Sequence, residues 1–384
     1  MKAPSLLCIF LRFLRIGLTA FGGPAMVPYI RAMAVDREQW LSEKNFKLGM
    51  AVSQMIPGAT AMQIAAYVGL RSRGGPGAVM AYLGFGLPAF LLMVALSALY
   101  FSAHDIPAVV AAFSGLQVIV VALILHATIN FARLYLDSLS SRLLACMAGI
   151  WLGLKGNPIL ALVAICVLAI FVFRDEHGSH FDTNIGKPVG RPLLSAGVFL
   201  TGLIAFIALL HLIDPRLFDL GLLMIKIDCF AFGGGYVSVP LMLHETVEVR
   251  GWLTSGQFMD GIALGQITPG PIVITGAFVG YVVAGLIGAS VAAVTVFTPS
   301  LIFLCAATPF ADRLAASPIA RRVLKGSLIS LVGLMAAVAA RFGLSVDWGI
   351  LEGGVAMASF VALRLGTDVL WVVLAGASLS ALIL

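Results

Sequence analysis

The feature that most constrains this chain is a succession of apolar stretches about 20 residues long, separated by short polar segments. One of them, residues 193–213, contains no Asp, Glu, Lys or Arg. Charged residues make up 11% of the chain, against about 25% in soluble domains, so there is too little polar surface to cover a water-soluble globule. The sequence therefore predicts an all-α polytopic membrane protein.

We expect about 13 transmembrane segments, some of them broken or re-entrant. They are placed near residues 5–28, 46–69, 76–101, 108–131, 142–156, 158–173, 193–213, 217–243, 257–281, 285–311, 323–342, 346–364 and 367–384. The pairs 142–156/158–173 and 346–364/367–384 are short for a bilayer about 30 Å thick, and each pair is alternatively one bent element.

The two halves of the chain carry the same ordered motifs at a constant offset of 211 or 212 residues. Phe-Gly-Gly, Val-Pro, Trp-Leu, Gln-x-x-Pro-Gly, Val-Gly and a later proline follow one another in the first half and recur in the same order, at this offset, in the second. Such an ordered series indicates an internal duplication. We expect an N-terminal repeat at 1–173, a polar linker and connecting helix at 174–213, and a C-terminal repeat at 214–384.

The orientation of the repeats follows from the number of crossings between equivalent points. The first repeat holds about six spans and one extra span precedes the second, so an odd count predicts two inverted repeats. Basic residues favour a cytoplasmic N-terminus and an external C-terminus by about two to one. The first external loop fits this poorly, because it carries Arg31, Arg37, Lys44 and Lys47, and we expect it to be a folded interfacial element.

Several function classes find no support in the sequence. No GxSxG, HExxH or Walker A pattern is present, so we expect no enzyme and no catalytic residues. The five cysteines are scattered and form no CxxC, so we expect no metal and no cofactor. The net charge of +6 contains no basic run longer than a pair, which argues against nucleic-acid binding and suits contact with the lipid bilayer.

Helix-breaking residues recur inside apolar stretches of both halves. Broken backbone in a bilayer is tolerated where protein buries it or water reaches it, and transporters build midplane sites from the ends of the resulting half-helices. A half-helix N-terminus offers free N–H groups and a positive dipole end, which suit an oxyanion, and glycine lets that anion approach. The alternative is that these glycines only permit close helix packing.

Thirteen residues are predicted to bind substrate. The backbone cradle consists of Gly22, Gly23, Pro24, Pro57, Gly58, Gly233, Gly234, Gly235, Pro269 and Gly270. Gln54 and Gln266 are predicted side-chain donors to the anion, with interhelical hydrogen bonding as the alternative. Lys226 is predicted to balance the anion's charge or to pair with Asp228, which could instead relay a proton.

The motifs "FLRIGLTAFGGPAMVPYI", "SQMIPGATAMQIAAYVG", "FAFGGGYVSVPLM" and "GQITPGPIVITGAFVGY" resemble the chromate ion transporter family of the long, two-domain type. The resemblance covers both halves. It implies a bacterial or archaeal inner-membrane transporter that expels chromate and confers chromate resistance, with sulfate as a competitor or counter-substrate. Two positions depart from the family pattern: Ala59 follows the first Pro-Gly, and Gly235 stands where the first copy has Pro24.

These observations lead to an expected secondary transporter that exports chromate by alternating access. Because no nucleotide-binding motif is present, we expect coupling to a proton or ion gradient, or to exchange with sulfate. A permease for sulfate or another small inorganic anion is the alternative, followed by a membrane scaffold or sensor. A homodimer is left open.

Overall fold

The computed structural model describes residues 4–19, 26–103, 106–174 and 191–383. These residues form helices joined by short connections, and no strand occurs among them. Five of the helices are long and apolar enough to cross a membrane. The prediction of an all-α membrane protein is therefore confirmed, whereas the number of spans and the inversion of the repeats remain predictions.

The chain divides into two compact units, and each unit takes segments from both sequence halves. The first unit comprises residues 1–91, 173–238 and 269–324, and the second comprises 92–172, 239–268 and 325–384. The predicted boundaries at 173/174 and 213/214 follow the sequence repeat instead, and they remain a prediction.

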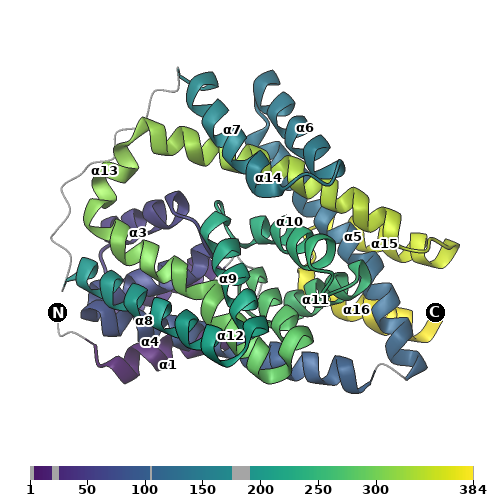
Figure 1. Ribbon diagram of the computed structural model, residues 1–384, viewed down its shortest axis with the longest axis horizontal. Helices are drawn as coiled ribbons and strands as arrows, with labels where there is room; N and C mark the ends of the chain where they lie inside the picture. The colour runs from purple at the N-terminus through teal and green to yellow at the C-terminus, as the bar shows by residue number, and fades with distance from the viewer. Residues whose placement is uncertain (1–3, 20–25, 104–105, 175–190, 384) are drawn as a thin grey trace. The chain divides into compact units, whose positions relative to one another are not determined.

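The first unit contains most of the interrupted helices. Its elements are α1 (Leu6–Thr19), α2 (Met26–Arg31), the π-helix η2 (Ala32–Arg37), α3 (Glu43–Met55), most of α4 (Thr60–Ser102), α8 (Pro192–Ile213), α9 (Pro215–Phe230), the 3₁₀ turns η3 (Gly235–Val237), η5 (Ile272–Ile274) and η6 (Thr308–Phe310), α12 (Thr275–Ala307) and α13 (Ala311–Ala316). Helix α9 packs against α12 and α8, as can be followed in Figure 1.

The second unit is built around α5 (Pro107–Tyr135), which packs against α11, α15 and α16. Its other elements are α6 (Leu139–Gly153), α7 (Pro158–Val172), most of α10 (Ser238–Met242), the π-helix η4 (Leu243–Val249), α11 (Ser255–Ile267), most of α14 (Pro318–Ser345), α15 (Ile350–Arg364) and α16 (Val369–Ile383). At 15 residues each, α6, α7, α15 and α16 are about 22 Å long, which is too short to cross a bilayer alone if straight.

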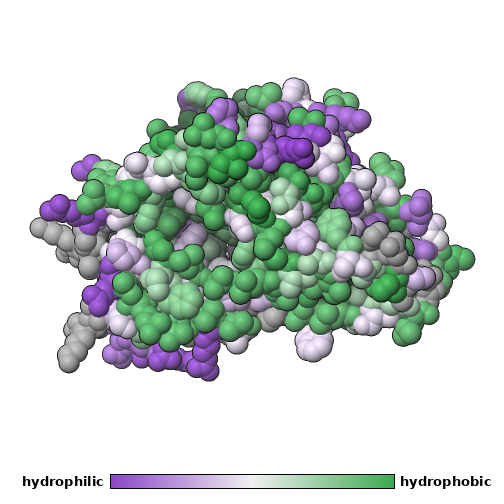
Figure 2. Space-filling view, turned by 60° about the horizontal axis from the view of Figure 1, so that its bottom comes forward, coloured by the Kyte–Doolittle hydropathy of each residue, from purple (hydrophilic) through white to green (hydrophobic). Residues whose placement is uncertain are grey.

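The surface carries many large apolar side chains. Leu212, Leu344 and Leu365 are each more than four-fifths exposed, and apolar residues cover much of the face seen in Figure 2. A soluble monomer rarely exposes contiguous apolar patches of more than a few hundred Å². Exposed apolar side chains on this scale fit a lipid environment.

Two long helices are in fact helical hairpins. Helix α4 reverses at Arg73-Gly74, where Gly74 has φ 67° and ψ −154°, and α12 does the same at Ala284-Gly285. A Cβ on Gly69 would collide with the carbonyl of Gly77, although residues eight apart in a straight helix are about 12 Å distant. Gly280 and Gly288 make the equivalent contact in α12. The first reversal falls in the gap predicted between the spans 46–69 and 76–101, and the second lies where the predicted span 285–311 begins.

The two sequence copies share further local geometry. The backbone N–H of Trp40 donates to Ala34 O and that of Trp252 donates to Thr246 O, both at 2.8 Å. The helices that follow, α3 and α11, are each 13 residues long and begin with a side-chain cap from Ser42 and Thr254 respectively. Equivalent sequence motifs therefore adopt equivalent local structures.

Candidate functional site

The first helix break lies between α3 and α4, at residues 56–59. Proline cannot donate to a helix, and Gly58 has a φ of 121°, a conformation that residues with a side chain rarely adopt. The side-chain amide of Gln63, in the first turn of α4, donates to the carbonyl of Pro57 at 2.5 Å and so holds the turn in place. The predicted Pro57-Gly58 interruption is therefore present, and both residues are buried.

The second break follows α9, at residues 231–234, where Gly233 and Gly234 have φ values of 86° and 106°. It lies against the first break, because the N–H of Gly58 donates to the carbonyl of Ala231 at 3.0 Å. A Cβ on Gly234 would lie 3.7 Å from the hydroxyl of Thr60, at the N-terminus of α4. Interruptions from the two sequence halves thus meet inside the first unit.

The third break, at residues 268–271, repeats the first. Gly270 has a φ of 136°, close to that of Gly58, and a Cβ on it would lie 2.8 Å from Cβ of Ala89. A Cβ on Gly58 would collide with the hydroxyl of Ser300. Because Ala89 and Ser300 are equivalent positions, each following the kink proline of its copy, the two contacts are reciprocal, as two copies around a twofold axis would make them.

A buried carboxylate lies next to the first break. Asp228 on α9 and Ser300 on α12 are both fully buried. Asp228 accepts hydrogen bonds from the N–H of Ser300 at 2.7 Å and from its hydroxyl at 2.6 Å. Ser300 comes directly after Pro299, where the proline interrupts the helical hydrogen-bond pattern and the serine N–H is turned to Asp228. Ser300 thus lies between Asp228, to which it is hydrogen-bonded, and the backbone of Gly58, against which its hydroxyl packs.

The other predicted site residues are placed as follows. Gly22, Gly23 and Pro24 lie outside the described residues. Gln54 is exposed near the end of α3, and Lys226 is half-buried on α9. Gly235 opens η3, and a Cβ on it would lie 2.8 Å from Ile272 of η5, so it adjoins the stretch that follows Pro269 and Gly270. Gln266 lies near the end of α11 in the second unit, and its role as an anion donor remains a prediction.

Sequence reasoning missed the residues that join the breaks. The sequence predicts no role for Ser300, although its place directly after the duplicated proline, Pro299, is a usable signal. The amide of Gln63 donates to the Pro57 carbonyl, a role that the sequence pattern does not indicate. The carbonyl of Ala231 carries no sequence signal, since every residue has one.

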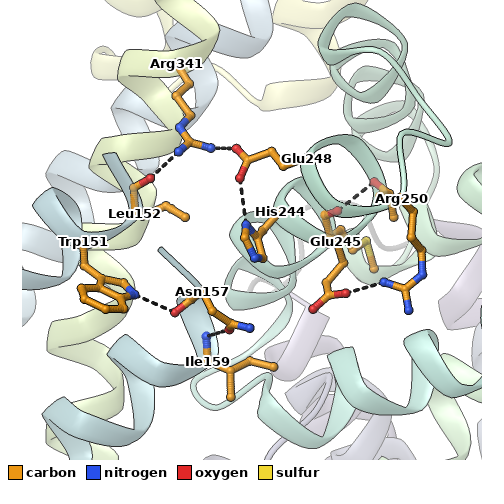
Figure 3. A network of polar contacts seen from close by, with 11 residues as sticks. Trp151, Leu152, Asn157, Ile159, His244, Glu245, Glu248, Arg250 and Arg341 are labelled. Carbon is orange, nitrogen blue, oxygen red and sulfur yellow. Dashed lines mark hydrogen bonds and ion pairs between the residues drawn. The ribbon is translucent and has the colours of Figure 1, made fainter. Parts of the chain in front are cut away.

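A separate charge network lies in the second unit, on the π-helix η4 (Figure 3). Glu248 pairs with Arg341 and with the Nδ1 of His244, the latter at 2.8 Å. Arg341 also donates to the carbonyl of Leu152, and Glu245 pairs with Arg250. At the equivalent helix of the first copy, η2, the ion pairs are more exposed: Arg31 of α2 pairs with Asp36 of η2 and with Glu43 of α3. The first loop is therefore folded, as expected.

The helix breaks in the first unit have chemical features that suit anion binding. Half-helices that begin at a break present first-turn N–H groups without an intrahelical acceptor and a positive dipole end. Gly58, Gly235 and Gly270 are closely packed by neighbouring side chains, whereas a Cβ on Gly234 would lie 3.7 Å from its nearest neighbour, the hydroxyl of Thr60, so the backbone has the most room there. No cluster of three or more His, Cys, Asp or Glu that could hold a metal occurs in the described part of the chain. These features define the class: a multi-pass helical membrane protein with interrupted helices that meet in one unit.

A family model described as "Chromate transporter" matches residues 7–171 and again residues 218–381. The chain is 43% identical over 348 residues to an uncharacterized transporter of Methanocaldococcus jannaschii, covering 90% of this chain and 87% of the relative. It is 34% identical over 342 residues to a chromate transport protein of Pseudomonas aeruginosa, covering 86% and 79%. It is 29% identical to a chromate transport protein of Cupriavidus metallidurans, covering 84% and 78%. The chain belongs to the chromate transporter family.

No solved structure was found to match this fold. The family is one of transporters, in agreement with the expectation that the chain is not an enzyme.

Proposed function

We propose that this protein exports chromate from the cytoplasm by alternating access, as a multi-pass protein of the inner (plasma) membrane, and so confers chromate resistance. Family membership and relatives named as chromate transport proteins support chromate as the substrate. The observation that carries the mechanism is the hydrogen bond from Gly58 N–H to Ala231 O at 3.0 Å, because it joins helix breaks from both sequence halves in one place.

In this proposal the breaks hold the oxyanion. Chromate is a tetrahedral dianion whose oxygens accept hydrogen bonds in several directions, which suits backbone N–H groups at half-helix N-termini. The cradle is Gly22-Gly23-Pro24, Pro57-Gly58, Gly233-Gly234-Gly235 and Pro269-Gly270. Gln54 and Gln266 supply side-chain donors, and the half-buried Lys226 offsets part of the negative charge.

The reciprocal contacts Gly58–Ser300 and Gly270–Ala89 support a twofold relation between the copies. We place that axis in the membrane plane, with about 13 crossings, a cytoplasmic N-terminus and an external C-terminus. Such inverted repeats allow one copy to rock against the other around a central site, which opens it to each side in turn.

The membrane potential favours the proposed direction. Moving one elementary charge across 100 mV is worth about 2.3 kcal/mol, so a dianion leaving a cell with a negative interior gains about 4.6 kcal/mol. Export by this route needs no nucleotide. The same potential opposes uptake of a free dianion, so a permease working inward would need a coupled cation.

The test uses purified protein in liposomes and measures the flux of radioactive chromate and radioactive sulfate under an imposed potential. We expect chromate to leave the negative compartment. Gly234→Leu and Gly22→Leu, once shown to be folded, should abolish that flux. Normal flux in both variants would refute the cradle. Sulfate flux without chromate flux would make the protein a sulfate permease, and no anion flux at all would refute transport.

A further inference from the structure

The carboxyl group of Asp228 is enclosed by neutral neighbours. It is fully buried on α9 and accepts hydrogen bonds from the N–H and the hydroxyl of Ser300 on α12. Neither donor carries a charge. A carboxylate buried with neutral donors alone is costly to keep ionised, because no opposite charge offsets its lost hydration.

The titratable groups around Asp228 come from several elements. Tyr82 of α4 donates its hydroxyl to Phe297 O at 2.7 Å, and Cys305 of α12 lies nearby. Cys229 is adjacent on α9, and Lys226 is two residues away, which turns its side chain by about 200° around the helix. On α8, His211 packs against Phe218, ten residues or about 15 Å along α9 from Asp228.

The hydroxyl group of Ser300 lies between Asp228 and the first helix break. Ser300 Oγ is 2.6–2.7 Å from the carboxylate, and the same oxygen occupies the space that a side chain on Gly58 would need. A Cβ on Gly58 would also lie 2.8 Å from the amide nitrogen of Gln63. The other atom of this amide, Oε1, is buried and has no hydrogen-bond partner in the described part of the chain. The hydroxyl of Ser300 alone would therefore separate an ionised Asp228 from an anion bound at Pro57-Gly58, and the two negative charges would repel each other.

We propose that Asp228 is a proton-binding site linked to the anion site, so that Asp228 is protonated when an oxyanion occupies the break at Pro57-Gly58. This inference rests on the proposed transport function and names its coupled ion. The proton comes from the aqueous side that the site faces and bonds to one carboxylate oxygen. The protonated carboxyl then donates to Ser300 Oγ, and the hydroxyl hydrogen of Ser300 turns away from Asp228 and towards the anion.

The link between proton binding at Asp228 and anion binding at the break couples the movement of the two ions. Like charges raise each other's energy, so neutralising Asp228 strengthens anion binding, and anion binding strengthens proton binding by the same factor. The proton and the anion then cross together, and the transported charge falls from two negative charges to one. An inward proton gradient drives uptake through such a site, whereas a potential that is negative inside drives export.

The first experiment measures binding of chromate to the purified full chain by calorimetry, above the pH range in which chromate itself takes up a proton. Buffers that differ in ionisation enthalpy report the number of protons taken up per anion bound. We expect about one proton for the wild type, and an affinity that falls about tenfold per pH unit once Asp228 is ionised. Asp228→Asn keeps acceptors for Ser300 and should take up no proton, with an affinity that does not depend on pH.

A matched control is available in the second unit. Asp260 is also buried and accepts from two neutral side chains, Tyr100 at 2.9 Å and Gln117 at 3.0 Å, but it is not part of the contact with Gly58. Asp260→Asn should keep the proton uptake of the wild type. Loss of that uptake in Asp260→Asn and not in Asp228→Asn would overturn the assignment.

Flux in liposomes separates this inference from the proposed function. We expect an imposed pH gradient alone to drive chromate accumulation in the wild type, and Asp228→Asn to retain chromate exchange while losing that accumulation. Wild-type flux that ignores the pH gradient, or a gradient response unchanged in Asp228→Asn, would overturn the proton site and leave the transporter standing. Absence of any chromate flux in the wild type would overturn both.

Discussion

The two Pro-Gly breaks share a backbone conformation but differ in what they touch. Gly58 and Gly270 have φ values of 121° and 136°, and each lies against the residue after the kink proline of the other copy. At the first break that residue is Ser300, bonded to Asp228; at the second it is Ala89. The residue equivalent to Asp228 in the first copy is Gly17, where a Cβ would lie 2.5 Å from the carbonyl of Phe85. The duplication thus preserved the turn and changed its chemistry.

The strongest test of this difference is a methyl group added to each glycine. Gly58→Ala should cost about 3 kcal/mol of unfolding free energy, because the methyl collides with buried Ser300 and Gln63 in addition to straining the backbone. Gly270→Ala should cost about 1–2 kcal/mol, since it meets one methyl group. Thermal unfolding in detergent measures both. Gly202→Ala, with nothing within 4 Å of the added carbon, is the neutral control, and equal losses at Gly58 and Gly270 would contradict the comparison.

The next largest difference in unfolding free energy is expected between the ion pairs of the two π-helices, η4 and η2. Glu248→Gln should cost about 2–3 kcal/mol, because Arg341 is left largely buried with a neutral partner and His244 loses an acceptor. Asp36→Asn should cost less than about 1 kcal/mol, because the side chains of Arg31 and Asp36 are 42% and 51% exposed. Denaturation of the two variants side by side measures the difference. A larger loss for Asp36→Asn would show that the first copy depends on its surface charges.

A smaller contrast concerns the residues after the kink prolines. Ser300→Ala removes the hydroxyl donor of Asp228 and leaves the N–H of residue 300, so we expect a loss of about 1–3 kcal/mol. Ala89→Ser adds a hydroxyl where no acid faces it, and we expect a change of about 1 kcal/mol or less. If the two substitutions were equally costly in thermal unfolding, the acid would not be what distinguishes the breaks.

The smallest expected effect is at the surface, where Asp137 of the first copy accepts from Lys325 of the second at 3.1 Å. The hydrogen bond from Lys325 lowers the pKa of Asp137 below its ordinary value of 3.8. The pair therefore stabilises the fold above that value, and the contribution disappears as the pH falls through the lower folded pKa. Asp137→Asn should cost no more than about 0.5 kcal/mol at neutral pH and nothing in stronger acid. A pH-independent loss would contradict this account.

The sequence predicted the positions of the interruptions well, because Pro and Gly act on their own backbone. Pro57-Gly58, Gly233-Gly234 and Pro269-Gly270 all lie at breaks between helices. The gap left between residues 69 and 76 proved to be a tight reversal at Gly74. These are local properties, and a local signal suffices to find them.

The partners of these breaks could not be predicted in the same way. Asp228 and Ser300 are 72 residues apart, and the contact depends on how α9 packs on α12. Lys226 and Asp228 were both visible as charges in an apolar stretch, but the neutral donors of Asp228 became apparent only from the fold. Gln54 recurs as Gln266 in the second copy, yet it is exposed near the end of α3. Repetition in sequence therefore identified turns more reliably than it identified side-chain roles.

The contact of Gly58 with Ser300 also has an evolutionary consequence. In a homodimer of identical half-length chains, both breaks would face the same residue, so an acid beneath one would require an acid beneath the other. An acid beneath only one break requires two copies that differ in sequence, as the two halves of this chain do at Asp228 and Gly17. Each copy supplies the residue that packs against the break of the other, so exchanging one copy for a second copy of its neighbour would change the contact at one of the two breaks.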